Sequence, residues 1–276
     1  MLGQERQGHG VVVSRDGLVL TVGYLVTEAE TIWVVDASGA AVSASLLGYD
    51  QTTGLAVVQT LGNLDVPPLE LGHSADLVVG QKMVMVGCGG AEQAIDTKLC
   101  EVGEFAGYWE YLLEQALFTE PAHPDWGGAA LVGEDGRLYG IGSLLLQPDN
   151  DKGEARNMII PIDLFHSTRL ALLAREEPDS PRPWLGWYIR NSKNGPIVLG
   201  TVDSAPAEKA GIVAGDVVVA VNGQRVHSIN DTFRKIWGTG EAGVSVDLAL
   251  RREDALRIIT VESVDRSAML WRPVLH

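Results

Sequence analysis

Short apolar or alternating runs, separated by turn residues, recur through the first half of this chain. Runs of this length are typical of β-strands, because strand side chains alternate between the two faces of a sheet. A fold built from them has to be a layered or closed arrangement of many short strands. The runs are Val11 to Val13, Leu18 to Leu20, Thr31 to Val35, Leu55 to Val58, Met83 to Val86, Leu131 to Val132 and Leu138 to Ile141.

Two of the predicted hairpins carry an Asp-Gly turn, at Asp16-Gly17 and at Asp135-Gly136. An Asp-Gly pair between apolar runs predicts a tight turn with positive φ at both central residues. The stretches around these turns, residues 12–23 and 131–142, also resemble each other in sequence. The first half is therefore predicted to contain two hairpins of similar sequence.

The second half changes character after a helical pattern at Leu164 to Leu173. Three prolines and several charges follow between residues 174 and 183, a composition that predicts a linker. The first domain is thus predicted at 1–166, a helix end and linker at 167–182, and a second, α+β domain at 183–276. In that second domain the pattern predicts strands at Ile197 to Val202, Val217 to Val221, Val244 to Leu250 and Ile258 to Val264, and helices at Pro206 to Ala210 and Asn230 to Trp237.

The net charge of −15 is unevenly distributed. Residues 1–166 hold 7 basic and 23 acidic side chains, whereas residues 167–276 hold 14 and 13. Nucleic acids and anionic membranes both attract basic surfaces, so neither is an expected partner. The acidic half is interpreted as a solubilising surface in preference to an electrostatic binding face.

The compartment is left open by the sequence. No apolar run approaches the roughly 18 residues of a membrane span, and residues 1–10 show no secretory signal. The protein is therefore expected to be cytoplasmic, unless the sequence is a trimmed form. Cys88 and Cys100 could form one disulfide, although buried free thiols are the favoured interpretation.

Three motifs of the first half carry a specific resemblance. The chain reads Gly8-His-Gly-Val-Val-Val-Ser-Arg-Asp-Gly-Leu-Val-Leu-Thr-Val-Gly-Tyr-Leu-Val26, then Gly48-Tyr-Asp-Gln-Thr-Thr-Gly-Leu-Ala-Val57, then His123-Pro-Asp-Trp-Gly-Gly-Ala-Ala-Leu131. These resemble, in order, the histidine, aspartate and serine motifs of the HtrA-type trypsin-like serine proteases. The similarity extends to Leu69-Glu-Leu-Gly-His-Ser74 and Met158-Ile-Ile-Pro161. It implies a mainly β fold whose first domain is a trypsin-like double β-barrel.

All three catalytic positions of the resemblance are substituted. Tyr24 stands where the family has histidine, Gly54 where it has aspartate and Gly127 where it has serine. Acyl transfer needs a nucleophile, a general base and a carboxylate that orients the base. Glycine supplies no nucleophile, and tyrosine, with a pKa of about 10, is a poor base at neutral pH. No catalytic residue is therefore assigned, and the chain is predicted to be a pseudoprotease.

No replacement catalytic or metal site is evident in the sequence. His123 and Asp125 flank the lost serine, but are interpreted as solvated or turn-capping, and Ser143 as a packed strand hydroxyl. The histidines and cysteines show no pair at a usual ligand spacing, so no metal or other cofactor is predicted. Trp126, Ala129 and Ala130 also depart from the family's motif, which puts the shape of its anion-binding loop in doubt.

The second domain resembles the PDZ domain that follows the protease in the same family. The resemblance is carried by Trp184-Leu-Gly-Trp187 and by the long run from Ser204 to Gly223, in which Asn222-Gly223 is a predicted hairpin turn. It implies that an extended peptide adds as a strand beside the one starting at Leu185, with its C-terminal carboxylate on the backbone N–H groups of the loop. The predicted peptide-binding residues are Trp184, Leu185, Gly186, Trp187, Ile189, Phe233, Ile236 and Trp237, on a strand and on a helix that Ser228 caps.

The predicted function is peptide or protein binding by a pseudoprotease acting as adaptor, scaffold or regulator. Expected partners are C-terminal peptides or extended protein segments, with active protease relatives and homo-oligomers as further partners that the family allows. If the sequence is a trimmed form, the resemblance implies a periplasmic or secreted location. Three alternatives stay open: residual or unconventional proteolysis, a structural oligomer whose two sites are vestigial, and a groove that Trp187 and Trp237 fill.

Overall fold

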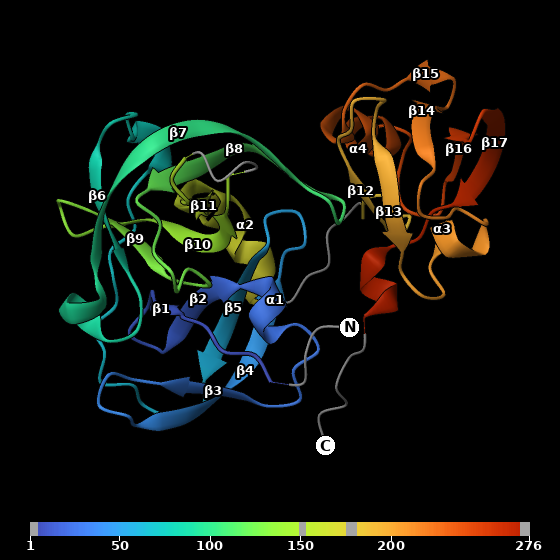
Figure 1. Ribbon diagram of the computed structural model, residues 1–276. Helices are drawn as coiled ribbons and strands as arrows, with labels where there is room; N and C mark the ends of the chain where they lie inside the picture. Colours follow the sequence, from blue (N-terminus) through green and yellow to red (C-terminus); the bar gives the residue numbers. More distant parts are fainter. Residues whose placement is uncertain (1–4, 149–152, 175–180, 271–276) are drawn as a thin grey trace. The chain divides into compact units, whose positions relative to one another are not determined.

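The computed structural model of the chain describes residues 5–148, 153–174 and 181–270. It divides into two compact units (Figure 1). Among the described residues, the first unit holds 5–104, 114–148 and 153–174, and the second holds Phe105–Leu113 together with 181–270. The mainly β prediction, with a trypsin-like domain followed by a PDZ domain, is confirmed.

The first unit begins with a five-stranded antiparallel sheet in the order β1-β2-β5-β4-β3. Its inner face carries a cluster of buried aliphatic side chains that includes Val19, Val26 and Val58. Strand pairing leaves β1 and β3 as the two edges of this sheet, so hydrogen bonding does not close it into a ring. The strands are β1 (Val11–Val12), β2 (Leu18–Val22), β3 (Ile32–Val35), β4 (Ala41–Tyr49) and β5 (Leu55–Thr60), with helix α1 (Gly23–Val26) after β2.

Six further strands form a closed barrel in the order β10-β11-β8-β7-β6-β9. Met83, Met85, Leu117 and Leu131 are among the buried side chains that fill it. The strands are β6 (Lys82–Val86), β7 (Ile95–Gly107), β8 (Tyr111–Glu120), β9 (Ala130–Gly133), β10 (Leu138–Leu146) and β11 (Arg156–Pro161); the helices of this part are η1 (Ser74–Asp76), η2 (Gly90–Gln93) and α2 (Ile162–Ala174).

The second unit is a sheet in the order β12-β13-β14-β16-β17, with β15 beside β14. Ser228 caps helix α4 as predicted, since its hydroxyl accepts a hydrogen bond from the Asp231 N–H at 3.1 Å. The elements are β12 (Trp187–Arg190), β13 (Ile197–Thr201), α3 (Pro206–Lys209), β14 (Val217–Val221), β15 (Gln224–Arg225), α4 (Ile229–Trp237), β16 (Ser245–Arg252), β17 (Ala255–Glu262) and η3 (Arg266–Met269).

The unit boundaries differ from the predicted domains in two segments, of which one is residues 167–174, predicted as helix end and linker but part of the first unit. The turn between β7 and β8, Phe105–Leu113, packs with the second unit although it lies in the middle of the predicted first domain. Sequence position alone could not show this, because the segment is tied to the second unit by long-range contacts. Residues 175–180 of the predicted linker lie outside the described residues.

The two Asp-Gly turns differ from the predicted type. Gly17 and Gly136 have φ of 80° and 77°, but neither aspartate has positive φ. The Gly17 N–H donates to the Ser14 carbonyl at 3.3 Å and the Gly136 N–H to the Gly133 carbonyl at 2.9 Å. Each hairpin therefore turns at the residues before the glycine, which supplies the left-handed step that a longer loop needs. Asn222 and Gly223, at 47° and 76°, form the predicted turn with two positive φ angles.

Both cysteines are free, and the predicted burial is wrong for Cys88, which is exposed. The Cys100 thiol is half-buried, and this burial raises its pKa. In the described part of the chain, no helix is long and apolar enough to span a membrane.

Candidate functional site

The fold brings the three predicted triad positions into one region of the first unit. Tyr24 lies on α1, directly after β2, and Gly54 lies directly before β5. The Gly54 carbonyl accepts a hydrogen bond from the Gly23 N–H at 2.8 Å. A Cβ atom built on Gly127 would lie 2.5 Å from the Tyr24 hydroxyl. The tyrosine thus reaches toward the position where a serine side chain would begin.

Tyr24 is poorly suited to accept a proton. Burial raises the pKa of its hydroxyl above the ordinary value of 10.0. That hydroxyl lies 3.4 Å from the backbone oxygen of Ser143, to which it donates a weak hydrogen bond. Gly54 has φ of 80°, a left-handed conformation that an aspartate adopts with strain. At the proposed aspartate position the backbone conformation, as well as the missing side chain, is therefore unfavourable for an aspartate.

The loop before Gly127 is held by a buried imidazole. His123 is 2% exposed, so its interpretation as a solvated residue is wrong, whereas its turn-capping role is seen. Its Nδ1 accepts a hydrogen bond from the Asp125 N–H at 3.0 Å, and its Nε2 lies 2.7 Å from the Gln93 carbonyl. In trypsin-like proteases the oxyanion hole uses the N–H of the nucleophile and that of the residue two positions earlier. The equivalent of the earlier donor, Asp125, already has an acceptor here.

His9 is a half-buried neighbour that the sequence analysis did not single out. Its backbone N–H donates to the Gly127 carbonyl at 2.7 Å, and its Nδ1 accepts from the Cys88 N–H at 3.0 Å. Burial lowers the pKa of its imidazole. A Cβ atom on Gly128 would lie 1.9 Å from the His9 carbonyl oxygen, so this close backbone approach requires glycine. His9 therefore helps to fix the loop without reaching a nucleophile.

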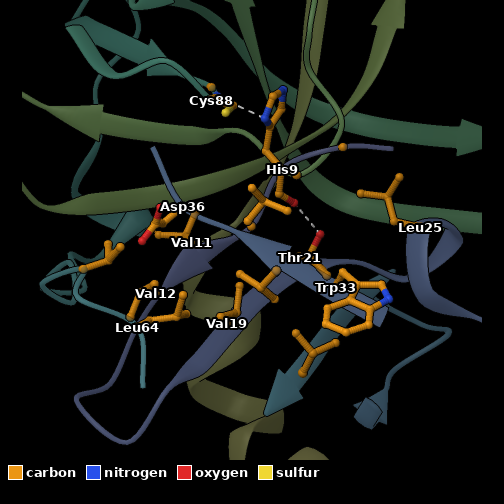
Figure 2. A pocket seen from close by; sticks show the side chains of 18 of the residues that line it. His9, Val11, Val12, Val19, Thr21, Leu25, Trp33, Asp36, Leu64 and Cys88 are labelled. Carbon is orange, nitrogen blue, oxygen red and sulfur yellow. Dashed lines mark hydrogen bonds between the residues drawn. The ribbon is translucent and has the colours of Figure 1, made fainter. Parts of the chain in front are cut away.

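A pocket of about 620 Å³ opens beside this region (Figure 2). Aliphatic side chains of β1, β2 and β3 form much of its wall, and Trp33 and Asp36 lie at its border. Tyr24, Gly54 and Gly127 do not line it. Its lining includes residues of both edge strands of the first sheet, β1 and β3, and residues 86–90 of the barrel part.

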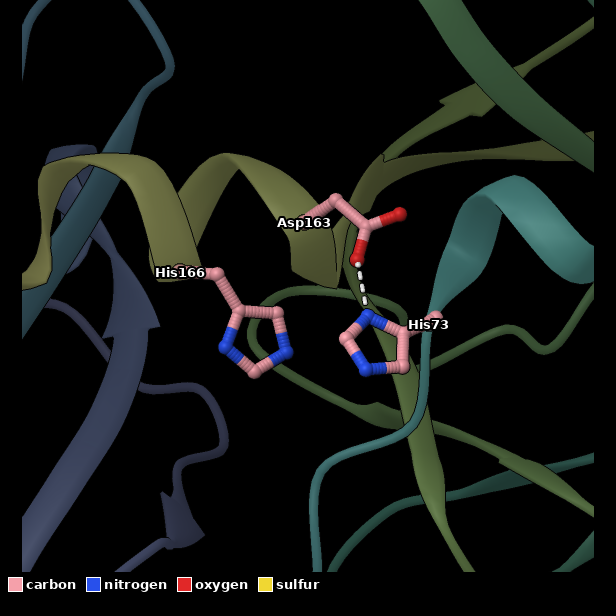
Figure 3. Close-up of side chains that lie close together, drawn as sticks. All are labelled: His73, Asp163 and His166. Carbon is pink, nitrogen blue, oxygen red and sulfur yellow. Dashed lines mark hydrogen bonds and ion pairs between the residues drawn. The ribbon is translucent and has the colours of Figure 1, made fainter.

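One group of metal-ligating side chains comes together among the described residues (Figure 3). His73, Asp163 and His166 have donor atoms within 4.8 Å of one another. Asp163 is also engaged in capping: its carboxylate accepts from the Ser74 hydroxyl at 2.9 Å and from the Ala75 N–H at 2.8 Å. The imidazole rings of His73 and His166 stack with centroids 5.2 Å apart. These three side chains could hold a metal, and no sequence spacing could reveal them because 90 residues separate His73 from Asp163.

The loop at the start of β12 presents a row of backbone donors in the second unit. The N–H groups of Leu185, Gly186 and Trp187 all point to one carboxylate, that of Glu110. The shortest of these bonds joins the Gly186 N–H to Glu110 Oε1 at 2.8 Å. Gly186 has φ of 77°, and a Cβ atom there would lie 2.3 Å from the Ala205 Cβ. Only glycine gives the loop this shape.

Glu110 comes from the turn between β7 and β8, and it too has positive φ, of 60°. Its side chain is buried, and this burial raises its pKa to about 7, while the three backbone N–H groups and the charge of Arg266 act in the opposite direction. Next to it in the turn, the Tyr108 carbonyl accepts from the Ile189 N–H of β12 at 2.9 Å. The turn therefore offers the loop a carboxylate and offers the strand edge a backbone acceptor.

The predicted groove residues largely come together in the core of this unit. Leu185, Trp187, Ile189, Phe233 and Ile236 belong to one buried cluster, with Trp237 packed against it. Trp184 stands slightly apart, paired by backbone hydrogen bonds with Val264. Ala106 of the β7–β8 turn also packs on this cluster. Sequence reasoning named several residues of this cluster but missed Glu110, because nothing in the local run Tyr-Trp-Glu-Tyr indicates a distant partner.

Together, these features define a class of protein: a trypsin-like domain joined to a domain with a carboxylate-binding loop at a sheet edge. A model of the trypsin-like peptidase domain matches residues 8–141, and a model of the PDZ domain matches residues 183–262. The chain is a homologue of the HtrA-type serine proteases that carry a PDZ domain.

Curated relatives agree with this assignment. The "Probable periplasmic serine protease do/HhoA-like" of Haemophilus influenzae is 27% identical over 259 residues, which is 89% of this chain and 55% of that protein. "Serine endoprotease DegS" of the same organism is 28% identical over 249 residues, or 84% of this chain and 69% of that protein. The chain thus spans about half the length of several of the relatives that it matches.

Solved structures support the fold. The structure described as "HtrA-type protease AlgW with decapeptide" matches with a TM-score of 0.58 and 22% identity, covering 97% of this chain and 83% of that one. A serine endoprotease from Yersinia pestis matches with a TM-score of 0.54 and 22% identity, covering 94% and 89%.

Proposed function

We propose that this protein is a catalytically inactive homologue of the HtrA-type proteases that works by binding peptides at its PDZ domain. The observation that carries the proposal is Gly127, which leaves no hydroxyl at the position of the nucleophile. Loss of a complete triad lowers turnover roughly a millionfold in the best-studied serine protease. A reaction of that kind is too slow to serve as a biological activity.

The surroundings of Gly127 support inactivity independently of that residue. The Tyr24 hydroxyl occupies the space beside it, and the Asp125 N–H is engaged by His123. Removal of a single oxyanion donor lowers turnover by about 10²- to 10³-fold. The site therefore lacks a nucleophile, a competent base and one of the two usual donors.

Peptide binding is supported by the loop of the second unit. Three backbone N–H groups converge on a carboxylate there, which is the arrangement that captures a peptide C-terminus in PDZ recognition. A structurally similar protease is described with a bound decapeptide. C-terminal peptides or extended protein segments are accordingly the proposed partners, and the protein acts as an adaptor, scaffold or regulator beside active relatives. A periplasmic location, as in the names of several relatives, is part of this proposal.

Activity-based labelling tests the first half of the proposal. We expect no labelling of the purified chain by a fluorophosphonate probe and no cleavage of casein, under conditions in which an active HtrA-type relative gives both. Tyr24→Phe is the informative variant, because tyrosine is the remaining side chain at a triad position. Turnover that survives purification and disappears in a single-residue variant of this chain would show an unconventional protease and end the proposal.

A further inference from the structure

We propose that the β7–β8 turn, Phe105–Leu113, is an internal ligand of the PDZ groove, which external peptides must displace in order to bind. This proposal rests on the proposed peptide-binding function and adds the regulation of the same site. In the absence of peptide, the groove is then occupied by a segment of the same chain.

The first argument is mutual exclusion at the carboxylate loop. The N–H groups of Leu185, Gly186 and Trp187 are the donors that a peptide C-terminus would use, and all three already donate to Glu110. A carboxylate has enough acceptor sites for several donors, but three convergent N–H groups can surround one carboxylate at a time. An incoming C-terminus therefore has to remove the Glu110 side chain.

The second argument concerns the edge of the sheet. Strand β12 lies at the end of the sheet order, with β13 on one side. On its other side the Ile189 N–H donates to the Tyr108 carbonyl at 2.9 Å. A peptide that extends the sheet needs such edge donors for its own carbonyls. The turn thus covers the strand edge as well as the carboxylate loop.

The turn is stiffened by its own aromatic side chains. Trp109 and Tyr111 stack with ring centroids 5.7 Å apart, and Phe105 lies 6.2 Å from Tyr111. Tyr108 meets Tyr188 of β12 with centroids 5.8 Å apart. A pre-organised segment loses little conformational freedom when it docks, which favours an internal ligand over a mobile loop.

Two features of the same turn oppose docking and make it reversible. Glu110 adopts φ of 60°, which is unfavourable for a residue with a side chain, and its carboxylate is buried. Burial raises the pKa of Glu110 to about 7; Arg266 is the charged neighbour that acts against this rise. Because the proton binds more tightly when the turn is docked, release of the turn becomes easier as the pH rises toward 7.

Competition with an internal ligand predicts a definite change in affinity. The apparent Kd equals the intrinsic Kd divided by the fraction of molecules whose groove is open. If the groove is open about a tenth of the time, removal of the internal carboxylate strengthens binding about tenfold. Glu110→Ala removes it entirely, and Glu110→Gln keeps the size of the side chain while removing its charge.

Glu253 offers a matched control. It is a glutamate at the turn between β16 and β17 of the same unit, with φ of 54°, but it is exposed. Glu253→Ala and Glu253→Gln therefore change the same residue type in the same backbone conformation, away from the groove. Both controls should bind peptides as the unmodified protein does.

The test uses the full chain and fluorescein-labelled decapeptides ending in Ala, Val, Leu or Phe, each with an amidated twin. We expect Glu110→Ala to bind free-acid peptides about tenfold more tightly than the unmodified protein, Glu110→Gln to fall between them, and the amidated twins to bind none of the proteins. Hydrogen exchange without peptide gives a second measurement. The amides of residues 185–187 should exchange faster in both Glu110 variants than in the Glu253 controls.

The contrary outcomes separate the two proposals. If the unmodified protein and both Glu110 variants bind free-acid peptides equally, peptide binding stands and the internal ligand is refuted. If free-acid and amidated peptides bind alike in every variant, the peptide-binding function fails and competition at the groove fails with it. If Glu110→Ala does not fold, Glu110→Gln decides the question, and unchanged exchange at residues 185–187 in that variant also refutes the proposal.

Discussion

The proposed triad region and the carboxylate loop of this chain differ in the kind of group that forms them. At the three proposed triad positions the chain has Tyr24, Gly54 and Gly127, and the backbone brings these positions together. At residues 185–187 the convergent groups are backbone N–H groups, which no substitution other than one by proline removes. Three substitutions are enough to remove a site that consists of side chains. A site that consists of backbone N–H groups is instead blocked when another group, here the Glu110 carboxylate, accepts their hydrogen bonds.

The largest expected effect concerns restoring the three triad side chains. If they restored full catalysis by themselves, the proposed difference between the triad region and the carboxylate loop would be wrong. In the variant Tyr24→His/Gly54→Asp/Gly127→Ser we expect turnover at least about 10²- to 10³-fold below that of an active relative, because the Asp125 N–H still donates to His123. Strain at residue 54 lowers it further, since aspartate must adopt φ of 80°. Casein cleavage and fluorophosphonate labelling measure the outcome, with serine replaced by alanine at residue 127 as the control.

A triple variant as fast as the active relative would show that the scaffold had kept a competent oxyanion hole. The triad region would then differ from the carboxylate loop only in its side chains. Labelling without turnover would instead place the defect in the later steps of the reaction.

A smaller effect, of about 3 kcal/mol, concerns the pH dependence of the second unit. Glu110 has a pKa of about 7 in the folded chain against an ordinary value of 4.5. Between these values the folded state binds more protons than the unfolded state, so stability falls as the pH rises. The contribution is fully present below about pH 4.5 and is lost as the pH passes through about 7, and a shift of this size corresponds to about 3 kcal/mol.

Urea unfolding followed by circular dichroism at pH 5 and pH 8 measures this contribution. We expect the unmodified protein to lose more stability over this interval than Glu110→Gln, with Glu253→Gln behaving as the unmodified protein. The other ionisable groups are common to all three proteins, apart from the exchanged glutamates, and cancel in the difference. An identical pH dependence with and without Glu110 would mean that its carboxylate is solvated and does not fill the loop.

The sequence predicted the two sites unequally well, for physical reasons. Strands marked by short apolar or alternating runs, such as those around Leu20 and Met85, and the long motif ending at Asn222-Gly223, were found because their determinants are local. The strands β4, β7 and β8 were not identified, since their small and charged residues, such as Ser43 and Lys98, obscure the alternation. The Asp-Gly turns were assigned the wrong type because loop length depends on how the flanking strands pair.

The polar side chains and carbonyls that pair within the two sites were harder to predict than the apolar residues around them. The walls of the PDZ groove follow from a strand and a helix whose positions the motif fixes. Glu110 lies 75 residues from Leu185, and only folding brings them together. The same holds for His123, whose role depends on the distant Gln93 carbonyl. Polar partners of this kind follow from three-dimensional packing and leave no local signal.

The smallest expected effect is a change of peptide specificity at Trp187. This indole replaces the aliphatic residue usual at the end of the carboxylate loop, so it should narrow the terminal pocket and favour peptides that end in small apolar residues. Trp187→Val should then raise affinity for peptides ending in Leu or Phe by about tenfold, which is about 1.4 kcal/mol. The affinities with and without Trp187→Val are best compared in proteins that also carry Glu110→Ala, because the Glu110 carboxylate then no longer competes with the peptide.

The structure adds a reason to check the fold of that variant first. Trp187 is 1% exposed within the core cluster, and replacing an indole by a smaller side chain there leaves a cavity. Its Nε1 has no hydrogen-bond partner among the described residues, so the substitution breaks no polar contact. If Trp187 is a wall, the ranking of peptides changes while the best affinity stays similar. If it is a gate, all free-acid peptides bind more tightly, because no side chain has to move before they enter. An unchanged ranking and an unchanged affinity would mean that the indole fills the core alone, and that specificity at this loop is set by other residues.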